Sequence, residues 1–417
     1  MRCFFLLLLL LGWGAIQSEA HNQVRVLLRV QPETKQFWCR YTLMLPADAA
    51  PSQLLLNLNK QYKILSIQSP RVKQQRIERY LYPVFQDTMQ GINLGFAPQD
   101  RRAKEVTVTY EGALPAKFAT DDVLELSGHT NWMPLLPYKE YEVVDYTLDV
   151  QAPDVYSVIS TSPATKQRAG HYRFQGTTCA IELTALVAKQ FYRLASASAM
   201  PSVTIYKAGS PLLKLDSLLL GESERIIGFY NQSIGRQDAI TRFSIFLPGT
   251  DRDAFAMLDN ATVITYPDFD VRQLEYRVTL AHEVSHKWWG YGAYSDYNDW
   301  LNEAFATYSS CLYLRAAGDT ASYRQLLNTK TKSATGAPAI LGFDKTKYNY
   351  ATYRRVIYDK GSVVLAALHQ RVGDQKFFAI LAATAAQKTA TTDAFLDVVA
   401  QEAGEETRRW LRTKLTQ

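Results

Sequence analysis

Two histidines four residues apart, with a glutamate directly after the first, constrain this chain more than any other feature. They form the run His282-Glu283-Val284-Ser285-His286. On an α-helix, residues i and i+4 lie one above the other, so both imidazoles can reach a single metal ion while Glu283 lies beside it. A histidine pair of this spacing is also compatible with an ordinary polar helix face. The run therefore predicts a metal-binding helix only if a third ligand follows.

Glu303 is the candidate third ligand. It lies in the run Trp300-Leu301-Asn302-Glu303-Ala304-Phe305, and the residues after it carry apolar side chains at helical spacing as far as a stop near Gly318. A glutamate near a helix start also suits the helix dipole without any metal. Combined with the paired histidines, however, it completes the set of three protein ligands and one open position that is typical of catalytic zinc.

These residues together predict one Zn²⁺ per chain, held by His282, His286 and Glu303. Zinc at such a centre makes a bound water easier to deprotonate, and Glu283 is the predicted general base. The His/His/Glu ligand set favours zinc over cobalt or manganese. We therefore expect a zinc hydrolase.

The chain of 417 residues reads as two folded parts after a leader. Residues 1–20 have the apolar run and small-residue end of a secretory signal peptide, which predicts export to a periplasm or to the exterior. Residues 21–201 alternate apolar and polar side chains, as in residues 24–30, 37–43, 106–110 and 146–150, and predict an antiparallel β-sandwich. Residues 202–417 mix a few strands with helices, including a metal helix at about 272–289 and a closing helix at 391–416. The predicted class is α+β.

Several partners are excluded by composition. No later segment is long and apolar enough to suggest a membrane span. The net charge of +6 is spread along the chain without a block of like charges, so no nucleic-acid partner is expected. Once the leader is removed, Cys39, Cys179 and Cys311 remain, which allows either a Cys39–Cys179 disulfide or three buried thiols.

The metal-site residues resemble those of the M1 aminopeptidases, which are gluzincins. A further match is Tyr358-Asp359-Lys360-Gly361, which is similar to the family's Tyr-x-Lys-Gly segment. The resemblance implies a thermolysin-like, mainly helical catalytic domain, peptide substrates, and a catalytic role for Tyr358 as a donor to the oxyanion. The connection between His286 and Glu303 has sixteen residues and is shorter than is typical of the family.

The run Ala256-Met257-Leu258-Asp259-Asn260 resembles the family's Gly-x-Met-Glu-Asn strand, which binds the substrate backbone. The resemblance implies substrate-binding roles for Ala256, Met257, Asp259 and Asn260, with Asp259 holding the N-terminal amine of a peptide. Asp259 stands where the family has glutamate and is one methylene shorter. We therefore keep two activities open: an aminopeptidase, and an endopeptidase or oligopeptidase.

The family's long C-terminal helical domain has no counterpart here, so we expect a short form with an open cleft. Such a cleft would admit longer peptides or be covered by a partner protein. Arg354 and Arg355 could supply positive charge toward a substrate carboxylate, or simply form a solvated helix face. A non-catalytic peptide-binding protein on the same fold is the alternative from another class, and the presence of both Glu283 and Tyr358 argues against it.

Overall fold

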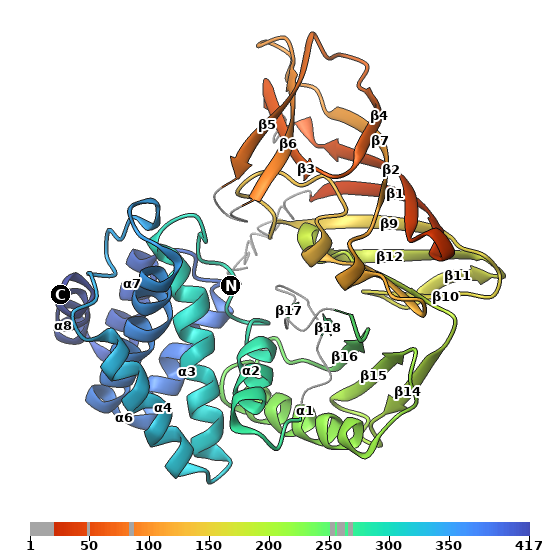
Figure 1. The fold of residues 1–417 in the computed structure, drawn as a ribbon. Helices are drawn as coiled ribbons and strands as arrows, with labels where there is room; N and C mark the ends of the chain where they lie inside the picture. The colour runs from red at the N-terminus through yellow and green to blue at the C-terminus, as the bar shows by residue number, and fades with distance from the viewer. Residues whose placement is uncertain (1–20, 48–50, 83–86, 251–254, 257–262, 266–269) are drawn as a thin grey trace, which may run out of the picture.

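The computed structural model describes residues 21–47, 51–82, 87–250, 255–256, 263–265 and 270–417. Two parts are visible in Figure 1: a β-rich N-terminal part and a part dominated by helices at the C-terminal end. The predicted signal peptide lies outside the described residues. Within them, no helix is both long and apolar enough to cross a membrane.

The N-terminal part is built from short alternating strands. Its strands are β1 (Asn22–Gln31), β2 (Gln36–Leu45), β3 (Gln53–Asn59), β4 (Lys63–Gln68), β5 (Gln74–Tyr82), β6 (Asp87–Gly95), β7 (Lys104–Ala113), β8 (Val123–Leu126), β9 (Val143–Gln151), β10 (Ser157–Ser160), β11 (Ala164–Arg168), β12 (His171–Cys179) and β13 (Ala185–Ala188). The four strands predicted from alternation lie within β1, β2, β7 and β9, so those predictions are confirmed.

These strands form a sandwich. One sheet has the order β11-β12-β9-β1-β2-β7-β4, and smaller sheets are β3-β6-β5 and β10-β13-β8. Every pair in the large sheet is antiparallel except β1 with β9, which run parallel. Leu28 and Leu148 from the large sheet share one buried core with Leu56 and Ile92 from a smaller one. Because successive side chains of a strand point to opposite faces, this shared core requires the sheets to lie face to face.

The strand order rules out the Cys39–Cys179 disulfide. Cys39 lies in β2 and Cys179 in β12, and two strands separate them in the sheet. Strands spaced by about 4.8 Å put the two Cα atoms at least about 14 Å apart, twice the reach of a disulfide. Cys39, Cys179 and Cys311 are all buried and none is in a disulfide among the described residues, as in the second alternative.

The second part begins with a five-stranded sheet and continues with helices. Its elements are β14 (Phe191–Ala195), β15 (Ser202–Ala208), α1 (Lys214–Ser233), β16 (Arg242–Leu247), β17 (Phe255–Ala256), β18 (Val263–Thr265), α2 (Leu274–Ser285), α3 (Trp300–Ala316), α4 (Thr320–Ala334), α5 (Tyr350–Arg354), a π-helix (Arg355–Lys360), α6 (Gly361–Ala386), α7 (Thr392–Ala403) and α8 (Glu405–Thr416). The sheet order is β14-β15-β16-β18-β17. The predicted domain boundary at 201/202 falls between β14 and β15, which pair with each other.

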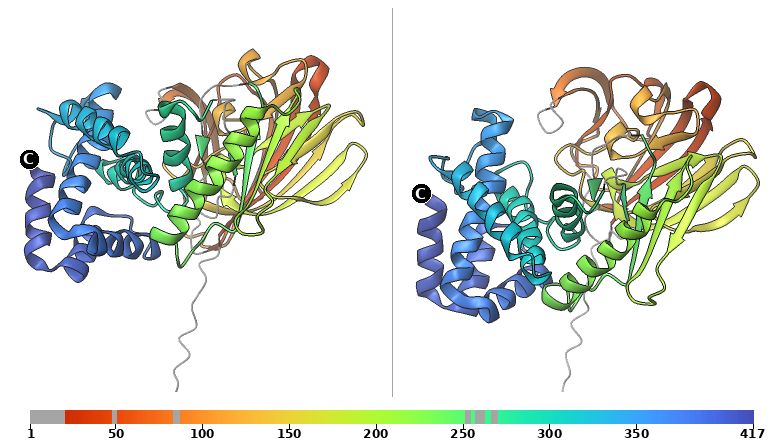
Figure 2. Two further views of the ribbon diagram at one scale, coloured as in Figure 1. Left: turned by 90° about the horizontal axis from the view of Figure 1, so that it is seen from below. Right: turned by 60° about the horizontal axis from the view of Figure 1, so that its bottom comes forward.

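Figure 2 shows α1 lying along this sheet and the helices α3 to α8 gathered on the far side of α2. Helix α2 therefore lies between the sheet and the helical bundle, and one buried core spans both. Two helix bounds differ from expectation. Helix α2 ends at Ser285, four residues early, and the predicted closing helix is broken at Gly404, whose φ of 87° interrupts α7 and α8.

Candidate metal centre and active site

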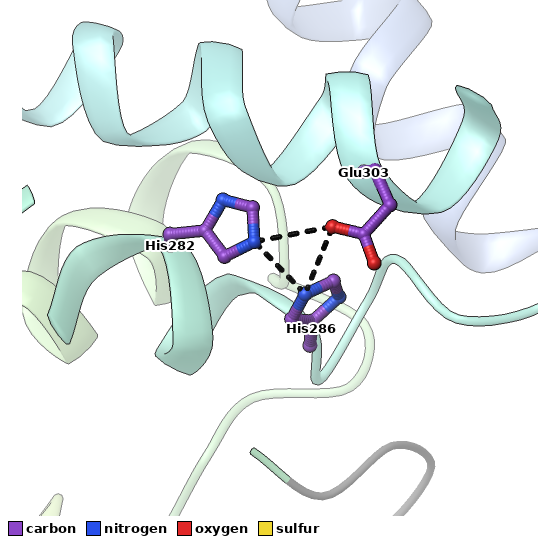
Figure 3. A group of neighbouring side chains, drawn as sticks. All are labelled: His282, His286 and Glu303. Carbon is purple, nitrogen blue, oxygen red and sulfur yellow. Dashed lines mark hydrogen bonds and ion pairs between the residues drawn. The ribbon is translucent and has the colours of Figure 1, made fainter. Parts of the chain in front are cut away.

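Helices α2 and α3 bring His282, His286 and Glu303 together, as Figure 3 shows. The Nε2 atoms of His282 and His286 are 3.2 Å apart. Glu303 Oε2 lies 3.3 Å from His282 Nε2 and 3.8 Å from His286 Nε2. Each of the three side chains is at most 20% exposed. The structure thus assembles the three residues that the sequence proposed as ligands.

The arrangement fits a zinc ion. Tetrahedral zinc with ligands at 2.0–2.1 Å separates its ligand atoms by roughly 3.3–3.5 Å, close to the distances found here. Glu303 Oε2 is buried and accepts no hydrogen bond in the described part of the chain. A buried carboxylate oxygen without a donor is unfavourable unless a cation satisfies it. Both the geometry and this unsatisfied oxygen therefore agree with a metal at this point.

The backbone after α2 orients His286. Because the helix ends at Ser285, the chain turns and the Trp289 carbonyl oxygen lies 2.8 Å from His286 Nδ1. A carbonyl can only accept, so Nδ1 carries the proton and Nε2 keeps its lone pair for a metal. The early end of α2, which the sequence did not predict, therefore fixes the tautomer of the ligand His286.

Asn302 holds the loop between the two ligand helices. Its Nδ2 donates to the Gly292 carbonyl at 2.9 Å, and its Oδ1 accepts from Gly292 N at 2.8 Å. A side chain at position 292 is excluded, since a Cβ there would lie 2.3 Å from the Asn298 oxygen. The short connection therefore closes tightly against the start of α3, one residue before Glu303.

Tyr358 lies beside the metal ligands on the π-helix. Its ring is parallel to that of His282, with centroids 6.2 Å apart and an interplanar angle of 6°. Single π-helical turns are frequent at functional sites. Burial, followed by the negative charges of Glu303 and Asp299, raises the pKa of Tyr358 well above 10. The hydroxyl therefore stays protonated and can act as a hydrogen-bond donor.

The residues after Tyr358 explain the Lys-Gly of its segment. A Cβ at Gly361 would lie 2.4 Å from Ala304 Cβ, so only glycine lets α6 approach α3 this closely. Lys360 Nζ donates to the carbonyls of Ala337 and Pro338 at 2.9 and 2.8 Å. Both contacts fix the π-helix against its surroundings and thereby fix Tyr358 relative to Glu303.

Asp299 and Tyr353 are site residues that sequence reasoning missed. Tyr353 Oη donates to Asp299 Oδ2 at 2.5 Å, and Asn302 Nδ2 donates to Asp299 Oδ1 at 2.9 Å. Burial, together with the charge of Glu303, raises the pKa of Asp299. The two partners are 54 residues apart, and no local spacing rule joins them.

The site opens into a cleft of about 1130 Å³. Its walls include Glu283, Tyr358 and the three metal ligands, with residues from both parts of the chain such as Tyr141. The volume is near the upper end of the range for small-molecule pockets, and a short peptide would fill it. Of the two arginines singled out in the sequence, Arg354 lines this cleft, whereas Arg355 donates to the carbonyls of Ser333 and Thr335.

The proposed substrate strand is described only in part. Met257, Asp259 and Asn260 lie outside the described residues. Ala256 belongs to β17, which pairs antiparallel with β18 and is the edge of the five-stranded sheet. An edge strand is what addition of a peptide strand requires.

Comparison with known proteins agrees with this site. Residues 257–413 match the Peptidase family M1 domain. The fold is similar to that of the M1 zinc metallopeptidase from Deinococcus radiodurans, with a TM-score of 0.69 and 18% identity over 95% of this chain and 94% of the other. A mutant of that metallopeptidase bound to a Tyr-Ser-Ala substrate matches with a TM-score of 0.68 and the same coverage.

A curated relative also matches part of the chain. Aminopeptidase M1-B of Oryza sativa subsp. japonica is 27% identical over 148 residues, which is 33% of this chain. The match spans only 17% of the length of that relative. The family match thus lies in the C-terminal part of the chain, and the structural comparison extends the shared fold to nearly the whole chain.

Proposed function

Because its catalytic half is a peptidase family M1 domain and its fold is that of M1 zinc metallopeptidases, we propose that this protein is a zinc-dependent aminopeptidase. The observation that carries the proposal is the three-ligand centre of His282, His286 and Glu303, with Glu283 and Tyr358 in the same cleft. The relative from rice is an aminopeptidase, and a Deinococcus radiodurans metallopeptidase of this fold binds Tyr-Ser-Ala.

Each of the site residues has a separate role in the proposed reaction. One zinc ion per chain, held by His282, His286 and Glu303, would supply a Lewis acid that polarises the scissile carbonyl and makes water more acidic. Glu283 takes the proton from the attacking water at its carboxylate and delivers it to the leaving amine. Tyr358 Oη donates to the carbonyl oxygen as negative charge develops there.

Asp259 is the proposed anchor for the N-terminal amine. It follows β17 in the sequence by three residues, and β17 is the edge strand beside which an extended peptide would lie. Met257 and Asn260, which lie outside the described residues, are proposed to bind the substrate backbone as well. A carboxylate that pairs with a free amine confines cleavage to the first residue of the peptide.

A ten-residue peptide, offered in free and N-acetylated forms to the zinc-loaded mature protein, tests this proposal. An aminopeptidase shortens only the free form, one residue at a time, and mass spectrometry resolves each product. Internal cuts in both forms would instead establish an endopeptidase, which is the second candidate because Asp259 is shorter than the glutamate it resembles.

Export is proposed on the character of residues 1–20, which read as a signal peptide. Expression of the full chain with a C-terminal tag, followed by fractionation and N-terminal sequencing, should find the mature protein outside the cytoplasm and beginning near His21. A full-length chain retained in the cytoplasm would contradict export.

A further inference from the structure

Two cations in the cleft, Arg354 and Lys345, form no salt bridge among the described residues. A third, Lys330, pairs with Asp359 at 2.7 Å. Arg354 donates one hydrogen bond, from Nη1 to Tyr350 Oη at 3.4 Å. Lys345 donates to the Tyr294 carbonyl oxygen. The carboxylates of Asp299 and Glu303 line the same cleft, but neither is in a salt bridge with these two cations.

Arg354 is held in place mainly by ring contacts and uses only its Nη1 donor within the described residues. Its Cζ lies 4.2 Å from the Tyr358 ring centroid and 5.9 Å from that of Tyr350, so the two rings fix the guanidinium by cation–π contact. A guanidinium has five N–H donors in a planar fork that matches a carboxylate. Most of these donors remain available to a ligand in the cleft.

The same contacts set the distance of Arg354 from the metal ligands. The Tyr358 ring contacts both His282 and Arg354: its centroid is 6.2 Å from the His282 ring centroid and 4.2 Å from Arg354 Cζ. The guanidinium is therefore at most roughly 10 Å from the His282 ring, a span that one to three residues of extended peptide cover. A cation at this distance from the metal ligands favours peptides that are short enough for their C-terminal carboxylate to reach it.

We infer that Arg354 binds the C-terminal carboxylate of a short peptide, so that the preferred substrates are di- to tetrapeptides with a free C-terminus. This inference rests on the proposed peptidase function and names its substrate class. It gives this cleft a carboxylate receptor that comes from the catalytic domain itself.

Arg355 provides a matched control. It is adjacent in sequence and carries the same charge, but its Nε and Nη2 donate to the carbonyls of Ser333 and Thr335, each at 3.0 Å. It does not line the cleft. Substitution there changes the net charge equally and leaves the proposed receptor intact.

The test compares one tripeptide as a free acid and as a C-terminal amide, with kcat/KM measured for the wild type, Arg354→Gln and Arg355→Gln. A charge-assisted bidentate contact predicts that the wild type prefers the acid by roughly ten- to a hundredfold. Arg354→Gln should bring the acid-to-amide ratio of kcat/KM close to one, because only the acid offers a carboxylate to the guanidinium, whereas any effect through the Tyr358 ring lowers both substrates equally. Arg355→Gln should keep the wild-type preference.

The amide measures any loss that acts through Tyr358 alone, and circular dichroism shows separately whether Arg354→Gln is folded. Equal cleavage of acid and amide by the wild type would overturn the inference while leaving the peptidase function intact. Loss of both activities in Arg354→Gln, with no change in their ratio, would show that the arginine only supports Tyr358. A ten-residue peptide with the same acid preference would contradict a length-selective receptor, and failure to cleave any peptide would instead refute the proposed function.

Discussion

Glu283 follows the ligand His282 on α2 but has a separate role from the metal ligands. The carboxylate lies in the cleft beside the ligand set without belonging to it. Glu283→Gln should therefore retain zinc and lose activity, because the amide keeps the shape and cannot accept the proton. The expected fall in kcat is about 10²–10⁴-fold. Peptide hydrolysis and metal analysis on the same sample check this, and a zinc-loaded variant with wild-type kcat would remove Glu283 from the mechanism.

Tyr358 acts through a single hydroxyl in this account. Its raised pKa keeps that hydroxyl protonated, and its ring is held between His282 and Arg354. Tyr358→Phe preserves the ring and removes the donor, so kcat should fall about 10²–10³-fold while KM changes little. Steady-state kinetics with one peptide measure both quantities. A rise in KM at constant kcat would assign Tyr358 to ground-state binding instead.

The approach of α6 to α3 is the contact between elements on which the site depends most. Gly361, three residues after Tyr358, contacts Ala304, which directly follows the ligand Glu303. Gly361→Ala places a methyl group 2.4 Å from Ala304 Cβ, which should lower the free energy of unfolding by about 1–3 kcal/mol and reduce kcat. Urea unfolding and peptide hydrolysis measure the two effects.

Gly228 supplies the control for that substitution. It lies within α1, and a Cβ there would meet nothing within 4 Å. Gly228→Ala should raise the free energy of unfolding by up to about 1 kcal/mol through helix propensity alone, with kcat unchanged. Equal effects of the two substitutions would show that the α3–α6 contact is not tight.

The two parts of the molecule meet at Glu140, which is 0% exposed. Its Oε1 accepts from Tyr82 Oη at 2.5 Å within the N-terminal part, and its Oε2 accepts from Tyr294 Oη of the loop after α2. Tyr294 and Tyr141 then stack edge to face at 5.0 Å, and both line or border the cleft. The β-rich part therefore contributes a wall to the active site.

Glu140→Ala leaves the buried Tyr82 hydroxyl and the half-buried Tyr294 hydroxyl without their acceptor and should lower the free energy of unfolding by about 1–3 kcal/mol. Glu142→Ala is the control: Glu142 pairs with Lys139 at the surface, and its loss should lower stability by less than about 1 kcal/mol. Chemical unfolding of both variants distinguishes them. Equal losses would mean that Glu140 does not connect the two parts.

Features that depend on residues close together in the chain could be predicted from the sequence. The four-residue spacing of His282 and His286 follows from helix geometry, and the strands from alternation, so both could be read directly. Tyr353 with Asp299, and Gly361 with Ala304, are contacts between distant segments and left no local pattern. The Cys39–Cys179 pairing was open for the same reason, because it depended on strand order. The predicted partner over the cleft and the roles of Met257, Asp259 and Asn260 stay predictions.

Zinc-dependent peptide hydrolysis is the central claim, and titrating metal-free protein with Zn²⁺ while following cleavage of one free peptide tests it most directly. The account predicts no cleavage before zinc is added, a rise that ends at one zinc per chain, and no rise in Glu303→Ala. Undiminished cleavage by the metal-free protein, or zinc bound at His282, His286 and Glu303 without any cleavage, would contradict it.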